Sequence, residues 1–247
     1  DMSAKAGCAI MDRNEMVLDL FEDPVARRGE SVISGSLISM DMFANVLRQI
    51  DVIDSARGDF KEPLEEDSSY VDQSILTGRR LIIDFVGGEI DQITCWGQAY
   101  AWYYPSSRGR PEMSENTVSG DTIYLTAVDE RLNQVEVIGG AIGTYLSGKV
   151  TQTDSAAIRV VDTIDYDAEY ILYELDDSLI TLVQGAHVTS GEVILDAFQI
   201  EYFTDREMIR AYSADVAADS GRDQYALRRV VQPNPIPVIL KDGDEEL

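Results

Sequence analysis

The sequence predicts an all-β protein, an elongated solenoid built from stacked repeats of about 42 residues. Two observations lead to this prediction. Apolar and polar residues alternate along most of the chain, as they do in β-strands that bury one face. The same pattern also returns at a fixed interval, which is typical of stacked repeats. Helical periodicity is nearly absent: residues 41–53 alone could form an amphipathic helix, but their counterparts in the other repeats contain paired glycines and β-branched residues.

The repeat becomes visible when three segments are aligned on Gly35, Gly78 and Gly120, with offsets of 43 and 42 residues. The aligned segments run over residues 34–60 and 77–103, and then over 119–145. Four columns keep their chemistry: Gln49, Gln92 and Gln134; Ile50, Ile93 and Val135; Ala56, Ala99 and Ala141; Phe60, Tyr103 and Tyr145. Because amide, apolar, small and aromatic columns recur together, the repeat is not a chance match.

Each repeat is predicted to contain β-strands joined by tight turns. In the second repeat Leu81, Ile83 and Phe85 alternate as a strand, and the paired glycines of the segment Val86-Gly-Gly-Glu89 suit a hairpin turn. Residues 90–104 then continue as one long bent strand or as two strands. Gly97 falls where a bend is expected, Gly139 repeats it, and Asp54 replaces the glycine in the first repeat.

The predicted organisation covers the whole chain. Residues 1–150 hold three diverged repeats, at about 8–60, 70–105 and 116–146, and residues 151–220 hold a further repeat. A hairpin is expected around Asp176 and Asp177. Residues 221–247 are Pro-rich and end in acidic residues, which predicts an edge strand or extended segment followed by a disordered tail.

The segment ITCWGQAYAWYYP, residues 93–105, places Gly97, Ala99 and Ala101 at successive inward positions. Two interpretations are open. Small residues stacked in every repeat could leave an unfilled apolar trough, or they could let two sheets approach closely. On the opposite face, Trp96, Tyr100 and Trp102 are expected to stabilise the sheet through cross-strand pairs, or else to form a docking patch.

Charge and cysteine content exclude several classes of function. The chain carries 45 acidic and 20 basic side chains, a formal net charge of −25. Nucleic-acid binding needs a basic surface, and adhesion to anionic membranes does as well, so neither is expected. Cys8 and Cys95 are too few for a disulfide framework and lack zinc-ligand spacing. A single bridge between them is allowed, but both are expected to be small buried residues.

The sequence does not predict an enzyme. His187 is the one histidine, and it lies in a strand pattern typical of a surface or turn residue. Nucleophile-elbow, zinc-protease and phosphate-loop motifs are lacking. Asp41 and Asp84 share a column that could supply paired carboxylates, but Thr126 takes that place in the third repeat. No catalytic residue, metal site or cofactor is therefore predicted.

Residues 172–213, LYELDDSLITLVQGAHVTSGEVILDAFQIEYFTDREMIRAYS, resemble the repeat of the OstA-like, LptA-type family. The resemblance lies in a strand with a Leu-x-Gly-x-Val habit at 182–188, an apolar strand ending in Ile-x-Tyr at 195–202, and an Ala-containing strand at 209–213. Diverged forms of further elements occur as Asp23-Pro24-Val25, as Ser34-Gly35 with Ile38, and as 97–104. The resemblance covers most of residues 8–215.

This resemblance implies a β-jellyroll or taco-shaped solenoid in the periplasm that carries lipopolysaccharide acyl chains along its groove as part of an outer-membrane assembly pathway. The implied partners are lipopolysaccharide or a similar amphipathic lipid, and other OstA-like modules stacked through edge strands. Arg79 and Arg80 could meet the lipid phosphates. The implied lining residues are Ile38, Met40, Leu81, Ile83, Phe85, Ile93, Gly97, Ala99, Ala101, Ile123, Leu125, Val135 and Ala141. The alternative is a structural or adhesive β-solenoid with a dry core and no ligand.

Overall fold

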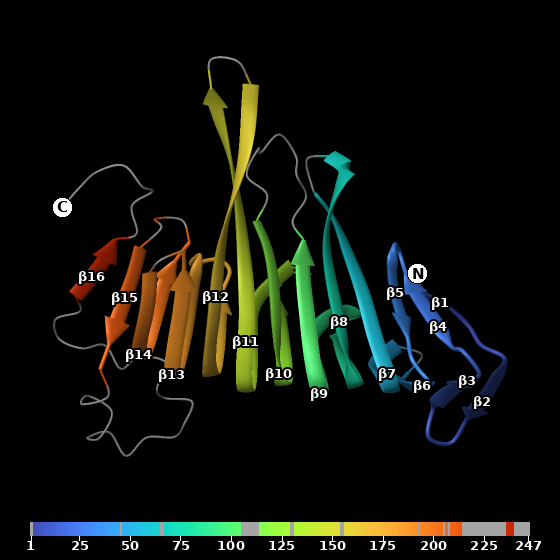
Figure 1. Ribbon diagram of the computed structural model, residues 1–247. Helices are drawn as coiled ribbons and strands as arrows, with labels where there is room; N and C mark the ends of the chain where they lie inside the picture. Colours follow the sequence, from blue (N-terminus) through green and yellow to red (C-terminus); the bar gives the residue numbers. More distant parts are fainter. Residues whose placement is uncertain are drawn as a thin grey trace.

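The computed structural model describes residues 2–44, 46–64, 67–104, 114–128, 131–153, 156–191, 193–204, 206, 208–213 and 236–239. All the regular structure in these ranges is β, and its sixteen strands join in one antiparallel sheet (Figure 1). Within the same ranges, no helix has the length and apolar character needed to span a membrane. The predicted all-β, elongated architecture is confirmed.

The strands are β1 (Met2–Lys5), β2 (Cys8–Asp12), β3 (Val17–Phe21), β4 (Val25–Arg28), β5 (Ser31–Ser34), β6 (Leu37–Phe43), β7 (Val46–Leu64), β8 (Asp67–Val86), β9 (Glu89–Tyr104), β10 (Ser114–Val128), β11 (Arg131–Thr153), β12 (Ala156–Glu174), β13 (Leu179–Ser190), β14 (Val193–Phe203), β15 (Met208–Tyr212) and β16 (Ile236–Ile239). From β7 onward each strand pairs with the next one along the chain. Figure 1 shows them side by side in that order, with β1 to β5 and β14 to β16 at opposite ends. The hairpin expected at Asp176 and Asp177 joins β12 to β13.

The sheet forks at its N-terminal end because β7 serves two separate neighbours. The first part of β7 pairs with β6, which continues through β3 to β2. The later part of β7 pairs with β5, which continues through β4 to β1. The point of division lies between Ile53 and Ala56, where the pairing of β7 with β8 also shifts register. A bend in β7 at this point therefore sends its two halves into different parts of the fold.

The same bend recurs in every second strand from β7 to β13. At each bend two successive residues have left-handed backbone conformations, which non-glycine residues adopt only at a cost. The four pairs, with their φ angles, are Asp54 (55°) and Ser55 (53°), Gly97 (75°) and Gln98 (57°), Gly139 (83°) and Gly140 (56°), and Gln184 (68°) and Gly185 (71°). The bends predicted at Asp54, Gly97 and Gly139 are thus present, and residues 90–104 form one bent strand.

Two tyrosines of β12 show that the two halves of a strand face each other. Tyr166 and Tyr173 are seven residues apart, which corresponds to about 23 Å along an extended strand. Their ring centroids nevertheless lie 6.4 Å apart in an edge-to-face arrangement. The bend between them has therefore folded β12 back on itself. The long strands together make a folded-over sheet whose two halves enclose an interior.

The glycines that define the repeat lie at the fold line of this sheet. A Cβ atom on Gly78 would come within 2.6 Å of Cys95 Sγ, and one on Gly120 within 2.7 Å of Val137 Cγ1. Gly35 would meet Val52 in the same way. The recurring glycines are therefore needed because an inward side chain of the next strand occupies the space that a Cβ would take.

The apolar columns of the sequence form continuous rows across the sheet. In one row the register joins Met40, Ile50, Ile83, Ile93, Leu125, Val135, Tyr173, Ile180, Tyr202 and Ile209. A parallel row joins Ile38, Val52, Leu81, Cys95, Ile123, Val137, Ile171, Leu182 and Ile200. The members of these two rows belong to the apolar core or pack against it. The core is thus a stripe that runs the length of the stack.

The glutamine column faces outward, and its first member, Gln49, forms a cross-strand hydrogen bond. Gln49 lies between Asp41 and Asp84 in the register, and its Nε2 donates to Asp84 Oδ1 over 2.7 Å. Asp41 in turn accepts hydrogen bonds from Arg48. The carboxylates of this column are therefore spaced by an amide and paired with donors, an arrangement that stabilises the sheet surface.

The outward aromatic residues also make contacts within the sheet. The Arg80 guanidinium lies 5.5 Å from the ring centroid of Trp96 and forms two hydrogen bonds with Asp51. Trp102 Nε1 donates to Glu115, a residue of the neighbouring strand β10. These contacts agree with the interpretation of Trp96 and Trp102 as residues that stabilise the sheet through cross-strand pairs.

The two cysteines and the C-terminal strand can also be compared with the predictions from the sequence. Cys95 is buried as expected, but Cys8 is exposed, so the prediction for Cys8 is wrong. The reason is that β2 lies at the end of the fork and its residues are exposed throughout. Residues 236–239 form β16, which pairs with β15 at the far end of the sheet, whereas 221–235 and the acidic tail lie outside the described residues.

Candidate functional site

The interior between the two sheet halves is the candidate site, and it holds most of the residues expected to line it. Ile38, Leu81, Ile83, Ala99, Ile123 and Ala141 are 0% exposed. Met40, Ile93, Leu125 and Val135 are buried as well, while Phe85 and Ala101 are half-buried and pack against the same core. The structure therefore brings these residues together along one apolar stripe.

Gly97 is the exception, and the prediction that it points inward is wrong. A Cβ atom at this position would lie 2.9 Å from the Cβ of Arg79, an exposed residue, and not against the core. The alternation of the strand breaks here because Gly97 and Gln98 form the left-handed bend. The inward series therefore passes from Cys95 to Ala99 without Gly97.

Neighbouring side chains fill much of the space above the small residues. A Cβ on Gly58 would overlap the ring of Phe60 on the same strand and would lie 3.2 Å from Cδ2 of Leu81, which comes from the other side of the bend. A Cβ on Gly143 would overlap the ring of Tyr166. Neither position therefore borders an unfilled trough: Gly58 allows close approach of the two halves, and Gly143 accommodates the ring of its neighbour Tyr166.

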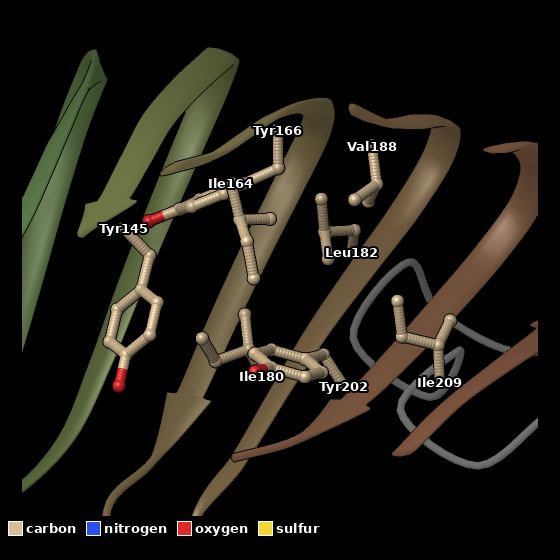
Figure 2. Close-up of a pocket in the computed structure, with 8 residues that line it drawn as sticks. All are labelled: Tyr145, Ile164, Tyr166, Ile180, Leu182, Val188, Tyr202 and Ile209. Atoms are coloured by element: carbon tan, nitrogen blue, oxygen red, sulfur yellow. The ribbon is translucent and has the colours of Figure 1, made fainter. Parts of the chain in front are cut away.

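The interior also contains a small cavity in its C-terminal part. Its volume is about 10 Å³, roughly the space of one water molecule. Figure 2 shows its walls, which come from both halves of the folded sheet. The lining residues are Tyr145, Ile164, Tyr166, Ile180, Leu182, Val188, Tyr202 and Ile209. An acyl chain does not fit this volume, so a lipid at this place must move the walls of the cavity apart.

Buried tyrosines distinguish the C-terminal part of the interior from the rest. Tyr166 and Tyr173 are each 4% exposed, and their hydroxyl oxygens lie 2.7 Å apart. The Tyr166 hydroxyl donates to Asn116 Oδ1, so the Tyr173 hydroxyl donates to Tyr166. Burial raises the pKa of both hydroxyls well above the ordinary value for tyrosine. We call Asn116, Tyr166 and Tyr173 the tyrosine tie.

The sequence analysis did not single out the tyrosine tie. Its candidate residues ended at residue 141, although the core continues through Ile171, Leu182 and Ile200. Alternation in residues 170–183 was the available signal for this part of the interior. Alternation could not predict that Tyr166 and Tyr173 contact each other, because residues seven apart lie on opposite faces of a regular strand. A bend between them was needed to bring both inside.

The single histidine lies on the outer face of the sheet. His187 Nδ1 is 2.6 Å from Asp196 Oδ1, and Nε2 is 3.1 Å from Thr189 Oγ1. The hydrogen bond with Asp196 raises the pKa of the imidazole. The Asp196 side chain is 78% exposed, so the three groups face water and are not enclosed in a site that could orient a substrate. We assign this arrangement no catalytic role.

Neither arginine expected near the lipid phosphates faces the interior. Arg80 lies on the outer face, where Asp51 binds it through two oxygens at 2.8 and 2.7 Å. This hydrogen bonding also raises the pKa of Arg80. Arg79 is exposed beside the bend at Gly97. The interior between the halves is thus lined by uncharged groups at the positions described above. Among the described residues, no group of three or more His, Cys, Asp or Glu side chains is placed to hold a metal ion.

Comparisons with solved structures add a distant likeness. No protein-family model matches the chain, and no curated protein matches it. A similar solved structure is LptH from Pseudomonas aeruginosa, described as the LptA-homologous periplasmic component of the conserved lipopolysaccharide transport device. The sequence identity is 12%, the alignment covers 98% of this chain and 96% of that chain, and the TM-score is 0.26. We base no inference on a similarity of this degree.

Proposed function

We propose that the protein binds the acyl chains of lipopolysaccharide, or of a related amphipathic lipid, between the two halves of its folded sheet, and that it serves as a periplasmic conduit towards the outer membrane. The observation that carries this proposal is the long stripe of core residues in the interior, which follows the rows of Ile50 and Val52 from β6 to β14. The resemblance of residues 172–213 to the OstA-like repeat supports it from the sequence.

The chemistry of the interior suits a hydrocarbon ligand. Around Leu81, Ile83 and Ile123 the two halves meet through hydrocarbon surfaces. Separating such surfaces exposes apolar area to water and removes dispersion contacts. An inserted acyl chain covers that area again and replaces the lost contacts. Each methylene that leaves water contributes about 0.8 kcal/mol. The lipid therefore replaces the contact between the halves with contacts of the same kind.

The charge of the protein constrains where the lipid headgroup can lie. At −25 the chain repels phosphate groups, and Arg80 is already bound to Asp51. We propose that the acyl chains alone enter, while the headgroup stays in water at the open side of the fold. Screening by salt or by bound cations then lowers the repulsion between the headgroup and the protein.

The ends of the sheet suit the stacking of further modules. Every residue of β2 is exposed, and Ile10 and Met11 are 57% and 41% exposed. Edge strands of this kind pair readily with a strand of another chain. We propose that a second OstA-like module adds its strand at such an edge, which would extend the apolar stripe from one module to the next.

A structural or adhesive role without a ligand is the second candidate. The specific observation in its favour is the filled interior: Leu81 lies over Gly58, and Tyr166 lies over Gly143. A stack of this kind needs no lipid to satisfy its apolar surfaces. The two candidates differ in whether an acyl chain ever contacts the inward side chains.

Photo-crosslinking separates the two candidates. A photo-reactive residue is placed at Leu81, which points inward, or at Ile82, which points outward, and the purified protein is irradiated with lipopolysaccharide. The conduit predicts crosslinks from position 81 and a background signal from position 82. The two positions are neighbours on one strand, so each serves as the control for the other. Absence of crosslinks at both positions would favour the ligand-free scaffold.

A further inference from the structure

The hydrogen-bonded tyrosine tie crosses the interior at one place. Asn116 belongs to β10, and Tyr166 and Tyr173 belong to the two halves of β12. The hydroxyl pair therefore connects the two sheet halves through polar groups, and the bond to Asn116 fixes Tyr166 within its own half. A second edge-to-face pair, Tyr145 with Tyr202, lies beside it at a centroid separation of 6.4 Å.

The interior on the N-terminal side of the tie has a different composition. One row of the register shows this clearly: it joins Gly58, Leu76, Ala101, Val118, Gly143, Tyr166 and Val188. Before Tyr166 the row contains aliphatic or small residues alone. Leu76 and Val188 thus lie in the same row of the interior on opposite sides of Tyr166, and they are 1% and 5% exposed.

The two sides of the tie should respond differently to an entering acyl chain. On the aliphatic side, the chain replaces one apolar contact with another. At the tie, it must break hydrogen bonds and leave buried hydroxyls without partners against hydrocarbon, which is unfavourable. Tyr166 is held especially firmly, because Gly143 leaves room for its ring and Asn116 Oδ1 accepts a hydrogen bond from its hydroxyl.

We propose that the tyrosine tie divides the interior into two compartments and stops an acyl chain at β12, so that the bound chain occupies the N-terminal compartment from β6 to β10. This inference rests on the proposed function and specifies where in the interior the ligand lies. Passage beyond β12 then requires the hydrogen bonds of the tie to open. Tyr166 and Tyr173 thereby determine how far along the stack a lipid can advance.

The test compares photo-crosslinking from position 76 with that from position 188, using lipopolysaccharide as the probe. With the tie intact, we expect position 76 to crosslink about tenfold more than position 188, the ratio that corresponds to one buried hydrogen bond left unmade. In the double variant Tyr166→Phe, Tyr173→Phe the rings remain and the hydroxyl pair is lost. The two yields should then approach each other.

The control variant is Tyr124→Phe, which removes a hydroxyl from the outer face of β10 and should keep the tenfold ratio. If the double variant does not fold, Tyr173→Phe alone should change the ratio in the same direction. Equal yields from positions 76 and 188 in the parent protein, or an unchanged ratio in the folded hydroxyl variants, would overturn the compartment proposal while leaving lipid binding intact. No crosslinks at positions 76, 81 and 188 would instead overturn the proposed function, and this inference with it.

Discussion

Replacement of Leu81 by alanine is expected to lower the free energy of unfolding by about 2–5 kcal/mol. Leu81 is 0% exposed and contacts residues from both sheet halves, since its Cδ2 lies where Gly58 leaves space. Truncation removes apolar burial and also leaves a cavity, because the two halves are held apart by the neighbouring rows. Urea denaturation followed by circular dichroism measures the loss.

The matched control is Ile82→Ala, one residue further along β8. Ile82 is half-buried on the outer face between Asp51 and Thr94 in the register, so its truncation leaves no enclosed cavity. We expect a loss of about 1 kcal/mol, the ordinary size for a substitution outside the core. Equal losses at positions 81 and 82 would contradict the assignment of inward and outward faces.

Substitutions at the bends are expected to have opposite signs at equivalent positions. Gly139→Val should lower the free energy of unfolding by about 2–3 kcal/mol, because a β-branched residue adopts φ = +83° with strain and its Cβ would lie 2.8 Å from Asp121 Cβ. Asp54→Gly should leave stability unchanged or raise it by up to about 1 kcal/mol, since glycine relieves the left-handed conformation at φ = +55°.

The same denaturation experiment measures both bend variants. Gly87→Val is a useful comparison for Gly139→Val, because its φ is also positive but a Cβ there meets no atom within 4 Å. The difference between the two valine variants then reports the crowding at the bend alone. A loss of stability in Asp54→Gly as large as that in Gly139→Val would contradict equivalent bends at the two positions.

The sequence was sufficient to predict the class of fold because the repeat and the strand alternation reinforce each other. The columns that begin with Ile50 and Ala56 form rows of the core. The alignment of Asp54 with the bend residue Gly97 also placed a bend at Asp54, where the structure has one. Where the prediction failed, a local break in alternation was responsible. Gly97 does not point inward, because it is part of a two-residue bend. Cys8 is exposed because it lies on an end strand, and the sequence did not show which strands lie beside it.

The candidate site was less predictable than the fold for a physical reason. Alternation shows which side chains point inward, but it does not show what they meet across the interior. Whether Gly58 and Gly143 border open space depends on the reach of other side chains: Leu81 of the facing half approaches Gly58, and the ring of Tyr166, from the adjacent strand, covers Gly143. The cross-interior bond from Tyr166 to Tyr173 likewise depends on the angle of the fold.

A packed interior and a lipid-binding role agree only if the two halves move apart when lipid enters. A distance between the halves therefore tests the central claim most directly. Nitroxide labels at Val86→Cys and Tyr100→Cys, in a Cys8→Ser background, would lie on exposed positions of opposite halves, at 66% and 41% exposure. Cys95 should stay unlabelled, because burial raises the pKa of its thiol to about 12.

The measurement is the distance between the two labels by double electron–electron resonance, with and without saturating lipopolysaccharide. The account predicts a longer distance in the presence of the lipid, by several ångströms, as acyl chains separate the halves. An unchanged distance under conditions where the lipid is bound would contradict it.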